Sequence, residues 1–170
     1  IFLSSSRVYS ISNLRNLFKS MNLKKPLKRR IKIDENFETI NPSSLYGFTK
    51  LSSEKLIQEF SYMTNIKYLI DRFGVIAGPW QFGKQDQGFV SLWMAKHLFK
   101  KKLNYIGFGG NGHQTRDLIH IDDVCSAFIS GLGASKNLIN SQAFNVGIHN
   151  GNYTVKEIAK AAQSRVPESK

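Results

Sequence analysis

A tyrosine and a lysine stand four positions apart in the segment Tyr46-Gly47-Phe48-Thr49-Lys50. On a helix this spacing places both side chains on one face, so that the phenol and the ammonium group point into the same space. A free phenol has a pKa of about 10 and is a poor base at neutral pH, but a neighbouring ammonium group favours the phenolate. The pair therefore predicts a general base for a substrate hydroxyl group. A surface tyrosine beside an unrelated lysine is the alternative, because the pattern often arises by chance.

Further polar groups that could take part in binding or catalysis lie on either side of this pair. Three consecutive serines, residues 4–6, follow a short apolar segment and precede Arg7-Val8-Tyr9, and by themselves they indicate a polar strand end. Arg116 carries a planar guanidinium group that can form two parallel hydrogen bonds to one anionic group. A structural pair with Asp117 is the alternative for that arginine.

Two kinds of site are disfavoured by the spacing of their residues. Residues 107–112 satisfy the pattern G-x-G-x-x-G, but no helix start follows before Asp122, as the dinucleotide fingerprint requires. The four histidines show no metal-ligand spacing, so no metal site is predicted.

The elements that must position these groups alternate between strand-like and helix-like patterns. The expected strands cover residues 1–3, 66–75, 103–106, 118–121 and 143–146. The expected helices cover residues 46–62, 89–99, 122–132 and a last one after the T-x-x-E capping box of Thr154 and Glu157. We expect a polar, basic surface excursion over most of residues 10–38. Alternating strands and helices indicate an α/β sheet.

Composition limits the class of protein further. The chain has 170 residues, a hydrophobic fraction of 41% and one cysteine, which excludes a disordered chain and favours a reducing, cytoplasmic setting. No apolar run is long enough for a membrane span. The net charge of +12 suggests an anionic partner, and much of it lies in residues 24–32 and 100–102. Because no aromatic residue interleaves with the first cluster, we do not expect nucleic acid to be that partner.

The motifs taken together resemble the extended short-chain dehydrogenase/reductase family, the NAD-dependent nucleotide-sugar epimerases and dehydratases. The strand ending in Ser-x-x-Val-Tyr, the Tyr-x-x-x-Lys helix, residues 72–79 and the R-D-x-x-H signature at residues 116–120 carry this resemblance. Residues 78–81, 86–88 and 105–110 are most similar to members of the CDP-paratose 2-epimerase (tyvelose epimerase) type. Gly74 and Val75 depart from the Asn or Ser that the family usually carries near this position, which leaves the sugar and the oxidised carbon open.

The resemblance implies a role for each matching residue. Catalysis would fall to Ser5, Tyr46 and Lys50. NAD would contact Leu3, Ser4, Tyr46, Lys50, Phe73 and Val75. A nucleotide-diphosphate sugar, a CDP-sugar in the first place, would contact Ser6, Arg7, Gln87, Gly88, Phe89, Asn104, Ile106 and Arg116.

The resemblance also implies how the chain is organised. We expect the later part of a Rossmann-type doubly wound parallel sheet with a portion of the small substrate-binding domain. Residues 1–78 and 118–150 would belong to the NAD-binding domain, and residues 79–117 and 151–170 to the substrate domain. The N-terminal βαβ units with the glycine fingerprint are absent from this sequence, so we expect a portion of a longer protein that is not active alone. A homodimer is compatible with this family. The alternatives are a nucleotide-sugar dehydratase, whose usual Asp-Glu pair is replaced by Ser6 and Arg7, and a non-catalytic basic binding module or truncated remnant.

Overall fold

Two compact units make up the chain, and each has its own sheet and helices. The computed structural model describes residues 1–20, 33–42, 44–84, 87–106, 110–134, 141–148 and 152–165. The first unit comprises Ile1–Phe73 and Ile129–Val146, and the second comprises Gly74–Phe128 and Gly147–Lys170. The basic stretch 24–32 and the glycines at 107 and 109 lie outside the described residues. The division into a cofactor domain and a substrate domain stays a prediction.

The first unit is built on a parallel sheet of three strands. Strands β1 (Phe2–Ser5), β2 (Leu69–Phe73) and β5 (Gln142–Val146) lie in the order β1-β2-β5. Phe2 lies beside Ile70, which lies beside Ala143. Ile70 and Phe73 are among the most deeply buried side chains, as expected for a central parallel strand that is covered on both faces.

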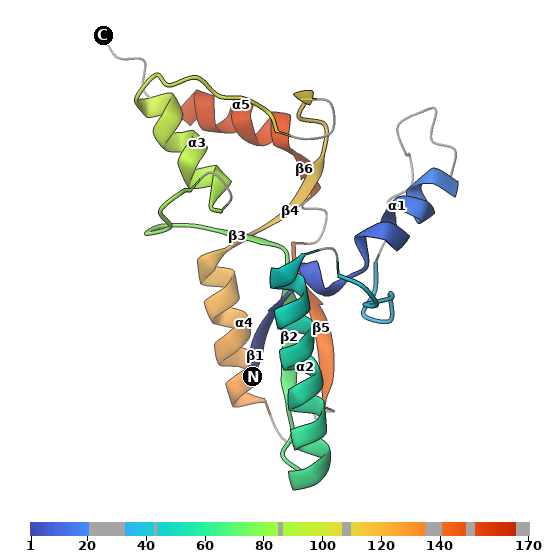
Figure 1. The fold of residues 1–170 in the computed structure, drawn as a ribbon. Coiled ribbons are helices and arrows are strands. Elements are labelled where there is room, and N and C mark those ends of the chain that lie inside the picture. Colours follow the sequence, from blue (N-terminus) through green and yellow to red (C-terminus); the bar gives the residue numbers. More distant parts are fainter. Residues whose placement is uncertain are drawn as a thin grey trace. The chain divides into compact units, whose positions relative to one another are not determined.

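The helices of the first unit connect β1 to β2. After the short 3-10 helix η1 (Ser6–Val8) come α1 (Ile11–Ser20) and α2 (Leu45–Thr64). Figure 1 shows α2 running alongside β1 and β2, and residues of α2 contact both β1 and η1. The expected surface excursion over residues 10–38 is wrong for its first part. There the buried Ser10 accepts a bond from the Asn13 amide and starts α1.

The second unit combines a small mixed sheet with two packed helices. Strand β3 (Val75–Ala77) is parallel to β4 (Thr115–His120), and β6 (Asn152–Thr154) is antiparallel to β4. Helix α3 (Phe89–Leu98) packs on α5 (Val155–Arg165) through a core of Trp93, Val155 and Ala159. Helix α4 (Ile121–Gly133) follows β4. The predicted capping box is confirmed, because the amide of Thr154 donates to Glu157 and the amide of Glu157 donates to Thr154.

Two expectations for the strands need correction, and one strand was missed. The single strand expected over residues 66–75 is two strands in two different sheets, β2 and β3, which are separated at Gly74. A Cβ atom at Gly74 would collide with the backbone oxygen of Asp117, so the chain changes sheets at a residue without a side chain. Residues 103–106 form no strand, because Leu103 and Tyr105 pack on Trp93 instead. Strand β6 was not expected. The α/β class with a parallel sheet is confirmed.

Candidate active site

The end of strand β1 presents the serine to which the sequence assigns a catalytic role. Ser5 has extended backbone angles and is 7% exposed. Its side-chain oxygen accepts a hydrogen bond from the amide of Arg7 at 3.2 Å and so caps η1. Ser6 and Arg7 follow directly in η1 with exposed side chains. The chain therefore turns sharply after β1 and holds Ser5 at the carboxyl end of a parallel strand, where α/β proteins place their binding sites.

Helix α2 begins so that Tyr46 and Lys50 occupy its first two turns. The hydroxyl oxygen of Ser44 accepts a bond from the amide of Gly47 at 3.0 Å, which starts the helix just before Tyr46. Tyr46 is 53% exposed. The ammonium nitrogen of Lys50 lies 6.0 Å from the centre of the Tyr46 ring, which confirms that the two side chains share one face.

Lys50 connects this helix to the serine strand. Its Nζ donates to the backbone oxygen of Leu3 at 2.8 Å and lies 4.9 Å from the centre of the Phe2 ring. A Cβ atom at Gly47 would collide with the backbone oxygen of Arg7, so the glycine lets the first turn of α2 approach the chain after β1. The structure thus brings the elements that carry Ser5, Tyr46 and Lys50 into contact. The role of Gly47 was missed from the sequence, although it stands inside the Tyr-x-x-x-Lys motif.

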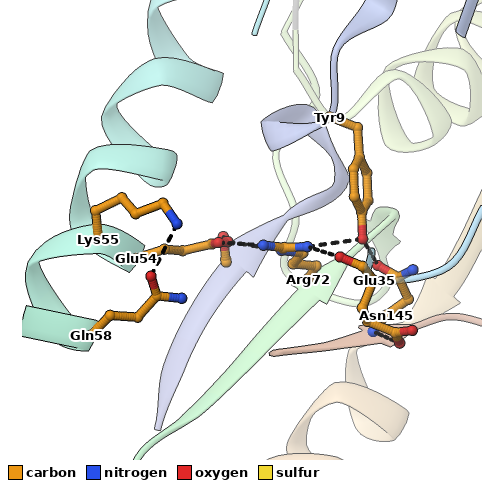
Figure 2. A network of polar contacts seen from close by, with 8 residues as sticks. Tyr9, Glu35, Glu54, Lys55, Gln58, Arg72 and Asn145 are labelled. Carbon is orange, nitrogen blue, oxygen red and sulfur yellow. Dashed lines mark hydrogen bonds and ion pairs between the residues drawn. The ribbon is translucent and has the colours of Figure 1, made fainter. Parts of the chain in front are cut away.

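A buried polar network joins α2 to β2 in the same unit, and it was also missed from the sequence. Figure 2 shows the guanidinium group of Arg72 between Glu54 on one side and Tyr9 with Glu35 on the other. Arg72 donates to Glu54 through Nε at 3.1 Å and Nη2 at 2.6 Å, and through Nη1 to the Tyr9 hydroxyl at 3.1 Å and the Glu35 backbone oxygen at 3.2 Å. Tyr9 in turn donates to Asn145 at 2.6 Å. Burial opposes the charge of Arg72, but the bonds to Glu54 and Tyr9 outweigh it and raise its pKa.

The signal for this network was present in the sequence. Glu54 stands at position i+4 from Lys50, so its carboxylate shares the helix face that packs on β1. Arg72 and Asp71 are the two charged residues of the strand Leu69–Phe73, whose other residues are apolar. An acidic group on an inward helix face and a basic group on a central strand predict a buried pair, since a lone buried charge is costly.

The remaining substrate-binding candidates belong to the second unit. Arg116 lies on β4 opposite Tyr153 of β6, and its Nη1 donates to the Thr115 backbone oxygen at 2.8 Å. Its neighbour Asp117 accepts a bond from the amide of Ile148 at 3.4 Å. Burial raises the pKa of Asp117.

The loop before α3 and the segment after it hold the other candidates of that unit. Gly88 adopts left-handed backbone angles, with φ of 63°, at the start of α3, where the Gly88 backbone oxygen accepts a bond from the amide of Leu92. Gln87 is exposed, and the ring of Phe89 packs edge-on against Trp93 at 5.5 Å. Asn104 and Ile106 are exposed. Val75 begins β3 in this unit, whereas the other predicted cofactor contacts, Phe73 among them, lie in the first unit.

The described residues contain neither a helix that could span a membrane nor a cluster of metal ligands. None of the helices found there has the length and apolar character needed to cross a bilayer. The same part of the chain brings no three His, Cys, Asp or Glu side chains together as a metal site would need.

Comparison with known proteins identifies the family to which this geometry belongs. The family model described as "NAD dependent epimerase/dehydratase family" matches residues 1–147. A putative UDP-glucose 4-epimerase of Methanocaldococcus jannaschii is 34% identical over 108 residues, which are 64% of this chain and 34% of that protein. CDP-paratose 2-epimerase of Salmonella typhi is 29% identical over 106 residues, or 61% of this chain and 31% of that protein.

Solved structures agree with this assignment. The crystal structure of UDP-glucuronic acid 4-epimerase from Bacillus cereus, in complex with UDP-glucuronic acid and NAD, matches 95% of this chain and 43% of its own length. The TM-score is 0.73 and the sequence identity is 26%. The chain spans about a third of the length of the curated relatives it matches. Its fold is the Rossmann-like α/β fold of these enzymes, and the chain belongs to the NAD-dependent epimerase/dehydratase family.

Proposed function

We propose that the protein containing this chain is an NAD-dependent nucleotide-sugar epimerase, with a substrate like that of CDP-paratose 2-epimerase. The observation that supports this best is the bond from Lys50 to the Leu3 backbone oxygen. It joins the helix with the Tyr-x-x-x-Lys motif to the strand that ends in Ser5. The membership in the epimerase/dehydratase family supports the same reaction class.

In this proposal three side chains share the proton chemistry. Tyr46 removes the proton of one sugar hydroxyl and later returns it, which its exposed position on α2 allows. Ser5 holds the hydroxyl oxygen through a hydrogen bond at the end of β1. Lys50 keeps a positive charge beside the phenol.

The residues of the first unit suit the nicotinamide half of NAD. Lys50 uses one of its three N–H donors on Leu3, so the ammonium group can also donate to a cofactor hydroxyl. The side chain of Leu3 is 40% exposed and offers apolar surface, whereas the hydroxyl group of Ser4 is bonded to Glu54. The proposed contacts with NAD are Leu3, Ser4, Tyr46, Lys50, Phe73 and Val75. The chemistry that NAD supplies when bound is the acceptance and return of a hydride at one sugar carbon.

We also propose which residues contact the nucleotide-diphosphate sugar. Arg116 would bind the diphosphate through its guanidinium group, which suits two phosphate oxygens at once. The other proposed contacts are Ser6, Arg7, Gln87, Gly88, Phe89, Asn104 and Ile106. The similarity to CDP-paratose 2-epimerase supports a cytidine nucleotide, and the similarity to the M. jannaschii protein makes a uridine nucleotide the competing one.

A product analysis with the full-length protein tests this function. The protein is incubated with NAD and, in separate reactions, with CDP-, UDP- and dTDP-hexoses, and each product is identified by NMR. We expect a CDP-sugar to be inverted at one carbon with no change in mass. Loss of one water molecule would identify a dehydratase instead. Absence of any sugar conversion, together with nucleic-acid binding that weakens steeply with salt, would identify the basic binding module.

A homodimer through α2 is proposed as the assembly. This helix exposes several large apolar side chains, namely Leu45, Phe48, Leu56, Phe60, Tyr62 and Met63. Apolar surface of this kind is typical of a protein interface. Light scattering should give twice the mass of one full-length protein, and Leu56→Lys should lower that mass to one copy. An unchanged mass for Leu56→Lys would contradict an interface at this helix.

A further inference from the structure

Glu54 is a buried carboxylate that the proposed mechanism does not use. It stands at position i+4 from Lys50 and i+8 from Tyr46, so the three side chains lie along one face of α2. Its side chain is 1% exposed, and charged residues are rarely buried to this degree unless they are paired.

The carboxylate of Glu54 is held from two directions. Arg72 binds both of its oxygens, Oε1 at 3.1 Å and Oε2 at 2.6 Å, and this forked pairing fixes the plane of the carboxylate. From β1, the hydroxyl group of Ser4 donates to Oε1 at 2.5 Å. Figure 2 shows that Arg72 is itself anchored beyond Glu54, because it also contacts Tyr9 and Glu35. Three hydrogen bonds from two residues therefore hold the carboxylate of Glu54 in place.

Successive residues of β1 are thereby attached to α2. The backbone oxygen of Leu3 accepts from Lys50, and the hydroxyl group of the next residue, Ser4, donates to Glu54. Ser5 is the following residue. Because Lys50 and Glu54 are one helical turn apart, the two bonds fix both the rotation of α2 and its position along the strand.

We propose that Glu54, held by Arg72, is a positioning residue for the catalytic groups. Through Ser4 it fixes the end of β1 against α2, and so it sets where Ser5 and the ammonium group of Lys50 lie relative to Tyr46. This inference rests on the function proposed above. Glu54 touches neither substrate nor cofactor in it.

The bond between Ser4 and Glu54 can be removed without breaking the ion pair. Ser4→Ala in the full-length protein deletes one hydroxyl group and leaves both bonds from Arg72 to Glu54 in place, so the variant should fold. Ser4→Thr restores a hydroxyl group at the same position. Ser53→Ala is the matched control, because the hydroxyl group of Ser53 donates within α2 to the Thr49 backbone oxygen.

The measurements are kcat, KM for the nucleotide sugar, the affinity for NAD and the urea midpoint of each variant. Each variant is saturated with NAD, because Ser4 is also a proposed NAD contact. For Ser4→Ala we then expect kcat to fall by about tenfold, with KM for the nucleotide sugar changed by less than about twofold, since misplaced catalytic groups slow the chemical step. Ser4→Thr should recover most of the loss, and Ser53→Ala should retain full turnover.

Two outcomes would overturn the inference. One is an unchanged kcat for Ser4→Ala. The other is a loss of activity that is fully explained by a lower folded fraction or by a raised KM. Tyr46→Phe separates this inference from the proposed function. If Tyr46→Phe abolishes turnover and Ser4→Ala does not slow it, the function stands and the positioning role of Glu54 is wrong. If Tyr46→Phe remains fully active, the proposed function is wrong, whatever the result for Ser4→Ala.

Discussion

The substitution Arg72→Met tests how the centre of the first unit is stabilised. It removes the guanidinium group and leaves the carboxylate of Glu54 with only the bond from Ser4, in a site where Glu54 is 1% exposed. Removing one partner of a buried ion pair typically costs about 3–5 kcal/mol, because the other charge stays buried without compensation. With an m-value of about 2 kcal/mol/M, the urea midpoint should fall by about 1.5–2.5 M.

The assay is urea unfolding of the full-length protein, followed by circular dichroism and by tryptophan fluorescence. The double variant Glu54→Leu with Arg72→Met is the control, because it removes both charges and keeps similar apolar volume. Exchanges of this kind are often neutral or stabilising, so the double variant should unfold at a higher urea concentration than Arg72→Met alone. A midpoint for Arg72→Met within about 0.5 M of the parent protein would refute the reasoning.

Three further predictions concern single side chains. Gly47→Ala should destabilise the protein by about 1–3 kcal/mol and lower turnover, because the new methyl group would collide with the backbone oxygen of Arg7. Gly133→Ala is the control and should do neither, because a methyl group there contacts no other atom. Equal unfolding midpoints for the two variants would contradict this prediction. Burial raises the pKa of Asp71, so the charged form of this side chain opposes folding. Asp71→Asn should therefore raise the free energy of unfolding at neutral pH. In a pH series this gain should vanish below the ordinary pKa of aspartate, where Asp71 is protonated in both the folded and the unfolded state. Hydrogen bonds from the capping box lower the pKa of Glu157, so Glu157→Gln should reduce the free energy of unfolding above the ordinary pKa of glutamate. The difference between the parent protein and the variant should disappear as the pH falls through the lowered pKa. A difference in unfolding midpoint that does not depend on pH would exclude the charge of Glu157 as its cause.

Local chemistry made part of this fold predictable from the sequence. The start of α2 follows from Ser44, whose side chain caps the helix, and the start of α5 follows from the reciprocal bonds of Thr154 and Glu157. The pairing of Tyr46 with Lys50 follows from helical spacing alone. In each case the partners stand within four positions of each other, so no knowledge of the tertiary structure was needed.

Contacts between distant residues explain the elements that were missed or misassigned. Gly74 separates β2 from β3 because of the Asp117 backbone, which approaches from a strand far along the sequence. The network of Glu54 and Arg72 joins a helix to a strand that stands 18 positions further along the chain, so local spacing could not predict it. Helix α1 was missed for a different reason, since its cap at Ser10 is a local contact that was not recognised among the polar and basic residues of this segment.

The central claim is that Tyr46 acts as the base on a nucleotide sugar, on a helix that Lys50 ties to the serine strand. Its most direct test is the turnover of the full-length protein and of Tyr46→Phe, each saturated with NAD and a CDP-sugar. General acid–base catalysis by one side chain typically contributes at least about a hundredfold, so the variant should lose at least that factor in kcat while it retains its unfolding midpoint and its affinity for the sugar nucleotide. A folded Tyr46→Phe protein with the turnover of the parent would contradict the account.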